Sequence, residues 1–401
     1  MKTNLLALAV VLGACAGDIA LDPCDIRKSS CQFDVFMAVQ DVRGSLWDPW
    51  LEPPPMHVIS EQQYRAQVVA GREQAMQNAG VDYLTPALKL LHMIDPNEEP
   101  DAATDFMVSS VAAYYDSFTH DVTIIDRGET ADPRLGVQTL AHELTHAAQD
   151  RDVGFPTLYQ NANTTDTLNA LSALLEGEAT VYGLLVDAKQ LDLPKTAINW
   201  RILADWAIEL RNDVFTHPSP YRPANTALAY PLGGLYMSAA YVAGGPLEVR
   251  RVYDDPPLSA ARFMAGRGKP GDVAAPAWTC GVTPPPEGMQ VQLGDELGPL
   301  SVFAFATRLF PTEAQAWDRA SAWTGDRFYV YAAAEQPEEI VLVWRIRFID
   351  AASATFFERA FLQSPWAGAL QRVVQGDTLT VTASSSSLST LYDDWMRCAA
   401  L

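Results

Sequence analysis

The segment His142–His146 constrains this 401-residue chain more than any other feature of its sequence. Its sequence, His-Glu-Leu-Thr-His, lies within residues 132–150, where Asp132-Pro133 followed by regularly spaced leucines predicts a helix. Residues four apart share one helical face, so both imidazoles can reach one metal ion. Glu143 is rotated by about 100° from His142, close enough to contact a metal-bound water without binding the ion. The alternative is an amphipathic helix with two ordinary histidines.

A catalytic zinc site needs a third protein ligand, and the residues that follow on the same helix do not supply it. The pattern HExxHxxGxxH is absent, because Gln149 and Asp152 occupy its Gly and third His positions. Asp150 continues the face of the two histidines, but it lies about 12 Å of helical rise from His142, too far for one shared ion. We therefore expect the third ligand on another element.

Two carboxylates in the next predicted helix, residues 165–189, are the better candidates. Glu176 and Glu178 interrupt an otherwise apolar run, and a buried carboxylate there needs compensation, which a zinc ion can provide. Only one of the two can face the ion, because they lie about 200° apart on the helix. The alternative interpretation is that both glutamates are exposed helix residues beside a glycine.

HExxH followed by a helix with Glu-Gly-x-Ala resembles the gluzincins, the zinc peptidases with two His and one Glu ligand. The resemblance implies that His142, His146 and Glu176 bind Zn²⁺. The sequence departs from the gluzincin pattern in two ways. Thr180 occupies the position where many gluzincins carry an Asp that orients a zinc-bound His, and 29 residues separate His146 from Glu176, more than the usual gap.

Other segments are similar to a group of uncharacterised bacterial secreted or lipoprotein zincins. The likeness covers roughly residues 60–400 and is most specific within 140–180. The segments are Tyr115-Asp116, HELTHAAQD from His142, LLEGEAT from Leu174, Tyr230–Gly234, Asp255–Ser259 and Trp323–Arg327.

The N-terminus predicts export. A short basic start precedes an apolar run from Leu5 to Ala14, which is too short to span a bilayer and fits a signal peptide. Leu12-Gly13-Ala14-Cys15 resembles a bacterial lipobox, in which Cys15 becomes a lipidated N-terminus; cleavage after Ala16 is the alternative. We expect a protein of the bacterial cell envelope, lipid-anchored in the outer membrane because Asp does not follow Cys15, or else secreted or periplasmic.

The cysteine count agrees with an oxidising compartment. Without Cys15 four cysteines remain, and the simplest of three pairings joins Cys24 to Cys31 and Cys280 to Cys398. The formal net charge of −21 argues against a nucleic-acid partner, because binding to phosphates needs clustered Lys and Arg.

The predicted fold class is α+β: a mainly helical zincin-like domain with a small edge hairpin or sheet, followed by a smaller α+β C-terminal module. The predicted organisation is a signal peptide (1–15), a tether (16–56), a metallopeptidase domain (57–283) and the C-terminal module (284–401). A β-hairpin is expected around residues 114–125, and by analogy with zincins its strand Val122–Ile125 would hold a peptide by edge pairing.

These features predict an envelope-anchored zinc metallopeptidase that hydrolyses protein or peptide substrates, with Glu143 as the base for a zinc-bound water. Tyr230, Tyr236 and His217 are candidate donors to the oxyanion. The alternative is a zincin-like lipoprotein whose metal site is structural or degenerate and which acts by binding a partner. Oligomeric state and the cleaved bond are not predicted.

Overall fold

The structure is a computed structural model. Cys15 of the predicted lipobox, Cys280 and Cys398 lie outside the residues that it describes. Those residues are 24–44, 52–78, 80–98, 104–105, 108–109, 111–128, 133–266, 288–333, 335–365 and 370–385.

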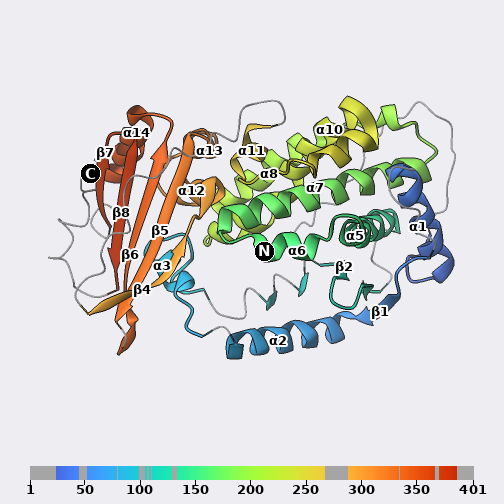
Figure 1. Ribbon diagram of the computed structural model, residues 1–401, viewed down its shortest axis with the longest axis horizontal. Helices are drawn as coiled ribbons and strands as arrows, with labels where there is room; N and C mark the ends of the chain where they lie inside the picture. Colours follow the sequence, from blue (N-terminus) through green and yellow to red (C-terminus); the bar gives the residue numbers. More distant parts are fainter. Residues whose placement is uncertain are drawn as a thin grey trace.

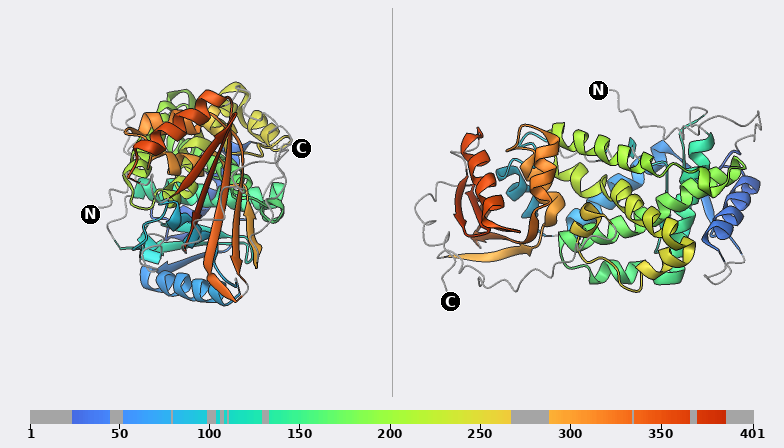
Figure 2. Two further views of the ribbon diagram at one scale, coloured as in Figure 1. Left: turned by 90° about the vertical axis from the view of Figure 1, so that its left-hand side faces the viewer. Right: turned by 90° about the horizontal axis from the view of Figure 1, so that it is seen from above.

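The fold is α+β and mainly helical, as predicted. Helices form the middle of the molecule, and a five-stranded sheet and helix α1 lie at opposite ends of its long axis (Figures 1 and 2). The helices are α1 (Ser29–Arg43), α2 (Glu61–Asn78), α3 (Leu84–Leu90), α5 (Pro133–Val153), α6 (Phe155–Asn161), α7 (Thr165–Gln190), η1 (Lys195–Ala197), α8 (Arg201–Thr216), α9 (Tyr221–Thr226), α10 (Ala229–Val252), α11 (Ala261–Ala265), α12 (Gly298–Ala306), α13 (Glu313–Ala320) and α14 (Ala351–Gln363). The strands are β1 (Met56–Ser60), β2 (Ala113–Asp116), β3 (Asp121–Asp126), β4 (Met289–Asp295), β5 (Trp323–Ala333), β6 (Gln336–Phe348), β7 (Gln371–Gln375) and β8 (Thr378–Ser384).

Helix α7 is the centre of the helical region and packs against both α5 and α10. Its contact with α10 is backbone to backbone at Gly177 and Gly233: a Cβ on Gly233 would lie 1.8 Å from the carbonyl oxygen of Ala173. No side chain fits there, so the two glycines set the distance between the helices. Gly177 follows Glu176 directly, and the close approach therefore brings the start of α10 next to that carboxylate.

The predicted hairpin is present as β2 and β3, but the prediction that Val122–Ile125 is an edge is wrong. Strand β1 pairs in parallel with β3 along its full length, and β2 pairs with the other side, giving the order β1-β3-β2. Both sides of β3 are thus occupied. Among the described strands, the edge strand of this sheet that lies next to α5 is β2, whose residues contact that helix.

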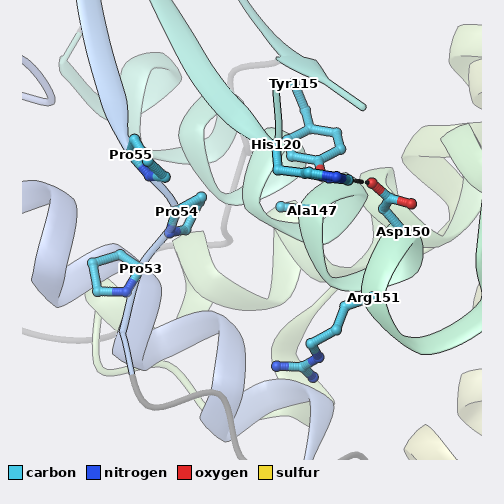
Figure 3. A pocket seen from close by; sticks show the side chains of 8 residues that line it. All are labelled: Pro53, Pro54, Pro55, Tyr115, His120, Ala147, Asp150 and Arg151. Atoms are coloured by element: carbon cyan, nitrogen blue, oxygen red, sulfur yellow. Dashed lines mark hydrogen bonds and ion pairs between the residues drawn. The ribbon is translucent and has the colours of Figure 1, made fainter. Parts of the chain in front are cut away.

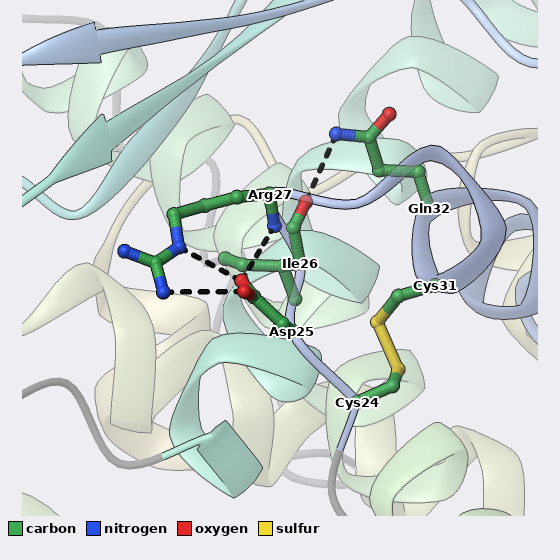
Figure 4. Close-up of a disulfide and its surroundings, with 6 residues drawn as sticks. All are labelled: Cys24, Asp25, Ile26, Arg27, Cys31 and Gln32. Carbon is green, nitrogen blue, oxygen red and sulfur yellow. Dashed lines mark hydrogen bonds and ion pairs between the residues drawn. A yellow bond between two sulfur atoms is a disulfide. The ribbon is translucent and has the colours of Figure 1, made fainter. Parts of the chain in front are cut away.

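Residues 29–43 contradict the prediction that 16–56 is a tether. They form helix α1, which packs against α5 and α7 and buries Val35, Phe36 and Val42 in the main hydrophobic core. The predicted disulfide Cys24–Cys31 is present and joins the segment before α1 to its first turn, where Gln32 also donates to the carbonyl of Ile26 (Figure 4). The N-terminal segment is therefore part of the folded unit.

The C-terminal sheet has the order β4-β5-β6-β8-β7 and is antiparallel throughout. Helix α14 packs against β6, β7 and β8, whereas α12 contacts β5 on one side and α7 and α9 on the other. One hydrophobic cluster includes residues from α1 to β8, so the core continues across the predicted boundary at 284. Within the described residues, no helix is long and apolar enough to cross a membrane.

Candidate metal centre

Helices α5 and α7 bring together the three predicted metal ligands, His142, His146 and Glu176. One ligand atom from each lies within 4.8 Å of the other two. The Nε2 atom of His142 is 2.9 Å from Glu176 Oε2 and 3.1 Å from His146 Nε2, and His146 Nε2 is 3.4 Å from Glu176 Oε2. We refer to these three residues as the metal cluster. Among the described residues it is the only group of three or more such side chains that could hold a metal ion.

The donor set and its spacing fit a zinc ion. Tetrahedral zinc with bonds of about 2.1 Å places its ligand atoms roughly 3.4 Å apart, close to the three distances found here. Two imidazoles and one carboxylate are a typical catalytic ligand set, which leaves one position for water or substrate. Between 14% and 20% of the surface of each of the three side chains is exposed, so the cluster is partly accessible to solvent.

The charges of the metal cluster depend on one another. Burial lowers the pKa of His146, but the Glu176 carboxylate and, after it, Glu143 raise that pKa to about 9. Burial raises the pKa of Glu176, but the two histidines outweigh it and hold the pKa well below its usual value of 4.5. Glu176 is therefore ionised at neutral pH and can serve as an anionic ligand.

Glu143 follows His142 on α5, and its carboxylate faces strand β2. It is buried, and its Oε2 atom accepts a hydrogen bond of 2.9 Å from the backbone amide of Tyr115. Burial raises the pKa of the Glu143 carboxyl, while the charges of His142 and His146 oppose this effect. A carboxylate with a raised pKa beside a metal site is suited to accept a proton near neutral pH.

Of the three candidate oxyanion donors, the structure brings only Tyr230 to the metal cluster. Its ring stacks on His142 with a centroid distance of 5.8 Å, and its hydroxyl hydrogen-bonds Glu176. The Glu176 charge and burial raise the pKa of Tyr230 well above 10, so the hydroxyl keeps its proton. Tyr236 instead packs against Phe263 in the core.

His217 is also remote from the cluster. It ends helix α8, where its Nδ1 atom accepts a hydrogen bond from the amide of Ser219 and its carbonyl accepts one from Arg308. The predictions for Tyr236 and His217 are therefore wrong, because helix packing in one case and the helix end in the other turn them to different neighbours.

Glu178 is fully buried and bound elsewhere, which excludes the alternative of two exposed glutamates. It pairs with Arg43 at 3.2 Å and accepts a hydrogen bond of 2.8 Å from Gln149. Gln149 also contacts His146, one of the predicted metal ligands. The sequence did not predict this contact, because position 149 stood out only as a departure from the HExxHxxGxxH pattern. Thr180 does not orient a histidine in this way; its methyl group faces Gly234.

A hollow of about 410 Å³ opens along α5, one turn beyond His146 (Figure 3). Pro53, Pro54 and Pro55 line one side of it and Tyr115 and His120 another, with Ala147, Asp150 and Arg151 from α5. The Asp150 carboxylate accepts a hydrogen bond of 2.7 Å from the Tyr115 hydroxyl and lies 3.0 Å from His120 Nδ1. Tyr115 thus connects this hollow to Glu143, because its hydroxyl binds Asp150 and its backbone amide binds Glu143.

Comparisons of the chain with protein-family models, with curated proteins and with solved structures found no match. The resemblance to gluzincins remains a prediction that rests on the residues quoted for it.

Proposed function

We propose that this protein is a zinc-dependent metallopeptidase. The observation that carries the proposal is the convergence of His142, His146 and Glu176 within 4.8 Å, with the buried carboxylate of Glu143 next to them. A structural metal site has no use for such a base, which favours an enzyme over a binding protein. In this proposal the three ligands hold Zn²⁺, which supplies a Lewis acid for the scissile carbonyl and lowers the pKa of the attacking water.

The chain's own residues supply the remaining functions. Glu143 accepts a proton from the attacking water on its carboxylate and delivers it to the leaving amine. The same residue therefore takes up and releases the proton. The amide of Tyr115 holds this carboxylate in place through the 2.9 Å bond. The hydroxyl of Tyr230, protonated and stacked beside His142, is a donor for the developing oxyanion.

Strand β2 supports a peptide as the substrate. The amide of Ile125 donates to the carbonyl of Ala112, and in an antiparallel ladder this pattern turns the backbone groups of Ala113 and Tyr115 away from β3. The Tyr115 amide is bound by Glu143, so the groups open to a substrate are those of Ala113 and the Tyr115 carbonyl. A substrate in extended conformation can pair with that edge, as peptides do in β-augmentation. The proposal includes the bacterial envelope as the location, with Cys15 as the lipidated residue, on the basis of the N-terminal sequence alone.

Metal content tests the proposal first. The chain without its signal peptide, expressed under oxidising conditions, is expected to carry about one zinc per molecule by elemental analysis. Glu176→Ala should lose the zinc, whereas the exposed helical Glu73→Ala should retain it.

Cleavage of a peptide library then separates an enzyme from a structural site. The zinc form should cleave peptides and the chelated form should not. A folded parent that takes up no zinc overturns the proposal. A parent that binds zinc but cleaves no peptide, in the library or in denatured protein substrates, supports the alternative of a binding protein with a structural metal.

A further inference from the structure

Gln149 lies fully buried between α5 and α7, one turn after His146. Its side-chain amide hydrogen-bonds on both sides. The Nε2 group donates to the Leu175 carbonyl at 3.0 Å and to Glu178 Oε2 at 2.8 Å, and Oε1 lies 2.8 Å from His146 Nδ1.

These partners fix the orientation of the amide. The nearest acceptors of the two Nε2 protons are a carbonyl and a carboxylate; the Tyr253 hydroxyl lies farther away, at 3.2 Å, and itself donates to Glu178. The amide cannot turn over without placing Oε1 against Glu178. The oxygen must therefore face His146. Because an amide oxygen only accepts hydrogen bonds, His146 Nδ1 has to be the donor and must carry a proton.

We propose that Gln149 is a positioning residue of the metal centre, which sets the tautomer and the ring orientation of His146 while Glu178 sets the orientation of Gln149. This inference rests on the proposed metal site. With a proton on Nδ1, the neutral imidazole has its lone pair on Nε2, the atom that lies 3.4 Å from Glu176. Metal-ligating histidines usually donate their other N–H to a carboxylate, carbonyl or water. Here an amide held by a carboxylate takes that role.

The arrangement extends to the N-terminal helix. Arg43, at the end of α1, contacts Glu178 at 3.2 Å and Asp152 at 2.9 Å, and all three side chains are at least 94% buried. The guanidinium compensates the charge of Glu178, which would otherwise be costly at this depth. Tyr253, directly after the end of α10, donates a further hydrogen bond to Glu178. Helix α1 thus supplies a charge that the positioning of His146 requires.

The test is zinc affinity, measured by competition with a chromophoric chelator on the parent and on isosteric variants. Gln149→Met removes the acceptor for His146 and should weaken zinc binding by about 10- to 100-fold. Gln149→Glu places a second carboxylate against Glu178 and should weaken binding as well. The double variant Gln149→Glu/Glu178→Gln exchanges the two groups, which restores the donor–acceptor pair between positions 149 and 178 and keeps an acceptor for His146, but leaves the Leu175 carbonyl without its donor. Affinity should therefore recover part of the loss. Gln160→Met, at an exposed position of α6, is the matched control.

The visible absorption spectrum of the cobalt-substituted protein adds a readout that global stability does not move. It should change in Gln149→Met and return to the parental shape in the exchange variant. If Gln149→Met keeps the parental affinity and spectrum while Glu176→Ala loses the metal, the positioning role is wrong and the proposed function stands. If the parent binds no zinc, the proposed function itself fails. If Gln149→Met does not fold, the exchange variant decides: recovery relative to Gln149→Glu supports the role, and a defect equal to that of Gln149→Glu overturns it.

Discussion

Helix α7 passes through two buried polar clusters that are built in opposite ways. Near its N-terminus, Asp166 lies beside Asp326 of β5 and Glu296, which we refer to as the acidic cluster. Asp326 accepts four hydrogen bonds, two on each oxygen, from the amides of Leu297 and Gly298 and from two indole N–H groups. About three turns further on, Glu176 faces two histidines whose Nε2 atoms point at it and at each other.

The two clusters differ in the groups that their acceptor atoms face. In the acidic cluster nearly every acceptor meets an N–H donor of the protein, as expected of a site that stabilises the fold. In the metal cluster, imidazole and carboxylate ligand atoms of two helices converge on one point, an arrangement that fits a metal ion. Buried carboxylates on one helix therefore serve the fold at one point and the proposed chemistry at another. The predictions below test that division.

The largest effect is expected from Glu143→Gln. The amide cannot accept a proton from water, so kcat/KM for peptide cleavage should fall by about 10²- to 10⁴-fold. Zinc content and thermal unfolding should stay at the parental level, because the three ligands are untouched. Steady-state kinetics with elemental analysis checks this, and a Glu143→Gln enzyme with more than a third of the parental activity would remove Glu143 from the mechanism.

Asp326→Asn is expected to have the opposite result, a loss of stability without a loss of zinc or activity. The Asn Nδ2 group cannot accept hydrogen bonds, so two buried N–H donors lose their acceptor, at a cost of about 3 kcal/mol in the free energy of unfolding. Zinc per folded molecule and activity per zinc should not change. Urea unfolding followed by circular dichroism provides the measurement, with the exposed Asp318→Asn as control. A loss below 1 kcal/mol, or a loss of zinc from the folded variant, would contradict the division.

The sequence predicted the metal cluster better than its surroundings. Spacing places His142 and His146 on one face, and a carboxylate in an apolar helix needs a partner, so both signals are local. The position of Tyr230 depends on Gly177 and Gly233, where two helices distant in sequence touch. Such a contact has no local pattern, which is why Tyr236 and His217 appeared equally suitable.

For the fold as well, the sequence predicted the features that depend on local patterns and not those that depend on contacts between distant segments. Helices α5 and α7 and the hairpin follow from periodicity and turn residues, and their bounds agree with the prediction within a few residues. Strand β1 pairs in parallel with β3 across more than sixty residues of chain, a register that the local sequence does not encode. Helix α1 was missed for another reason: it buries Arg43 through partners on α5 and α7, and those partners are visible only in the folded chain.

A smaller effect is expected from removing the disulfide. The double variant Cys24→Ser/Cys31→Ser opens a loop with a sequence separation of seven, and the loss of this cross-link should cost about 2 kcal/mol. Because α1 carries Arg43 behind the metal cluster, zinc affinity should fall slightly in the same variant, by less than the change expected for Gln149→Met. Urea unfolding and chelator competition on one preparation test both points. Unchanged stability would show that α1 is held by its core contacts alone.

The last prediction distinguishes the two clusters by how the stability of the protein depends on pH. Burial first, and the charges of Asp326 and Glu296 after it, raise the pKa of Asp166 to about 8, against an ordinary value of 3.8. Between these two pH values the folded chain binds more protons than the unfolded chain, so this residue makes the protein less stable as pH rises from about 4 to about 8. Asp166→Asn, which mimics the protonated form, should match the parent near pH 3, below both pKa values, and should exceed its stability increasingly as pH rises, by more than about 1 kcal/mol at pH 8. Measured without metal, His146 and Glu176 titrate in both proteins and cancel in the difference. Parallel stability curves for parent and variant would mean that Asp166 does not hold its proton, and that the acidic cluster is stabilised by its N–H donors in the ionised state.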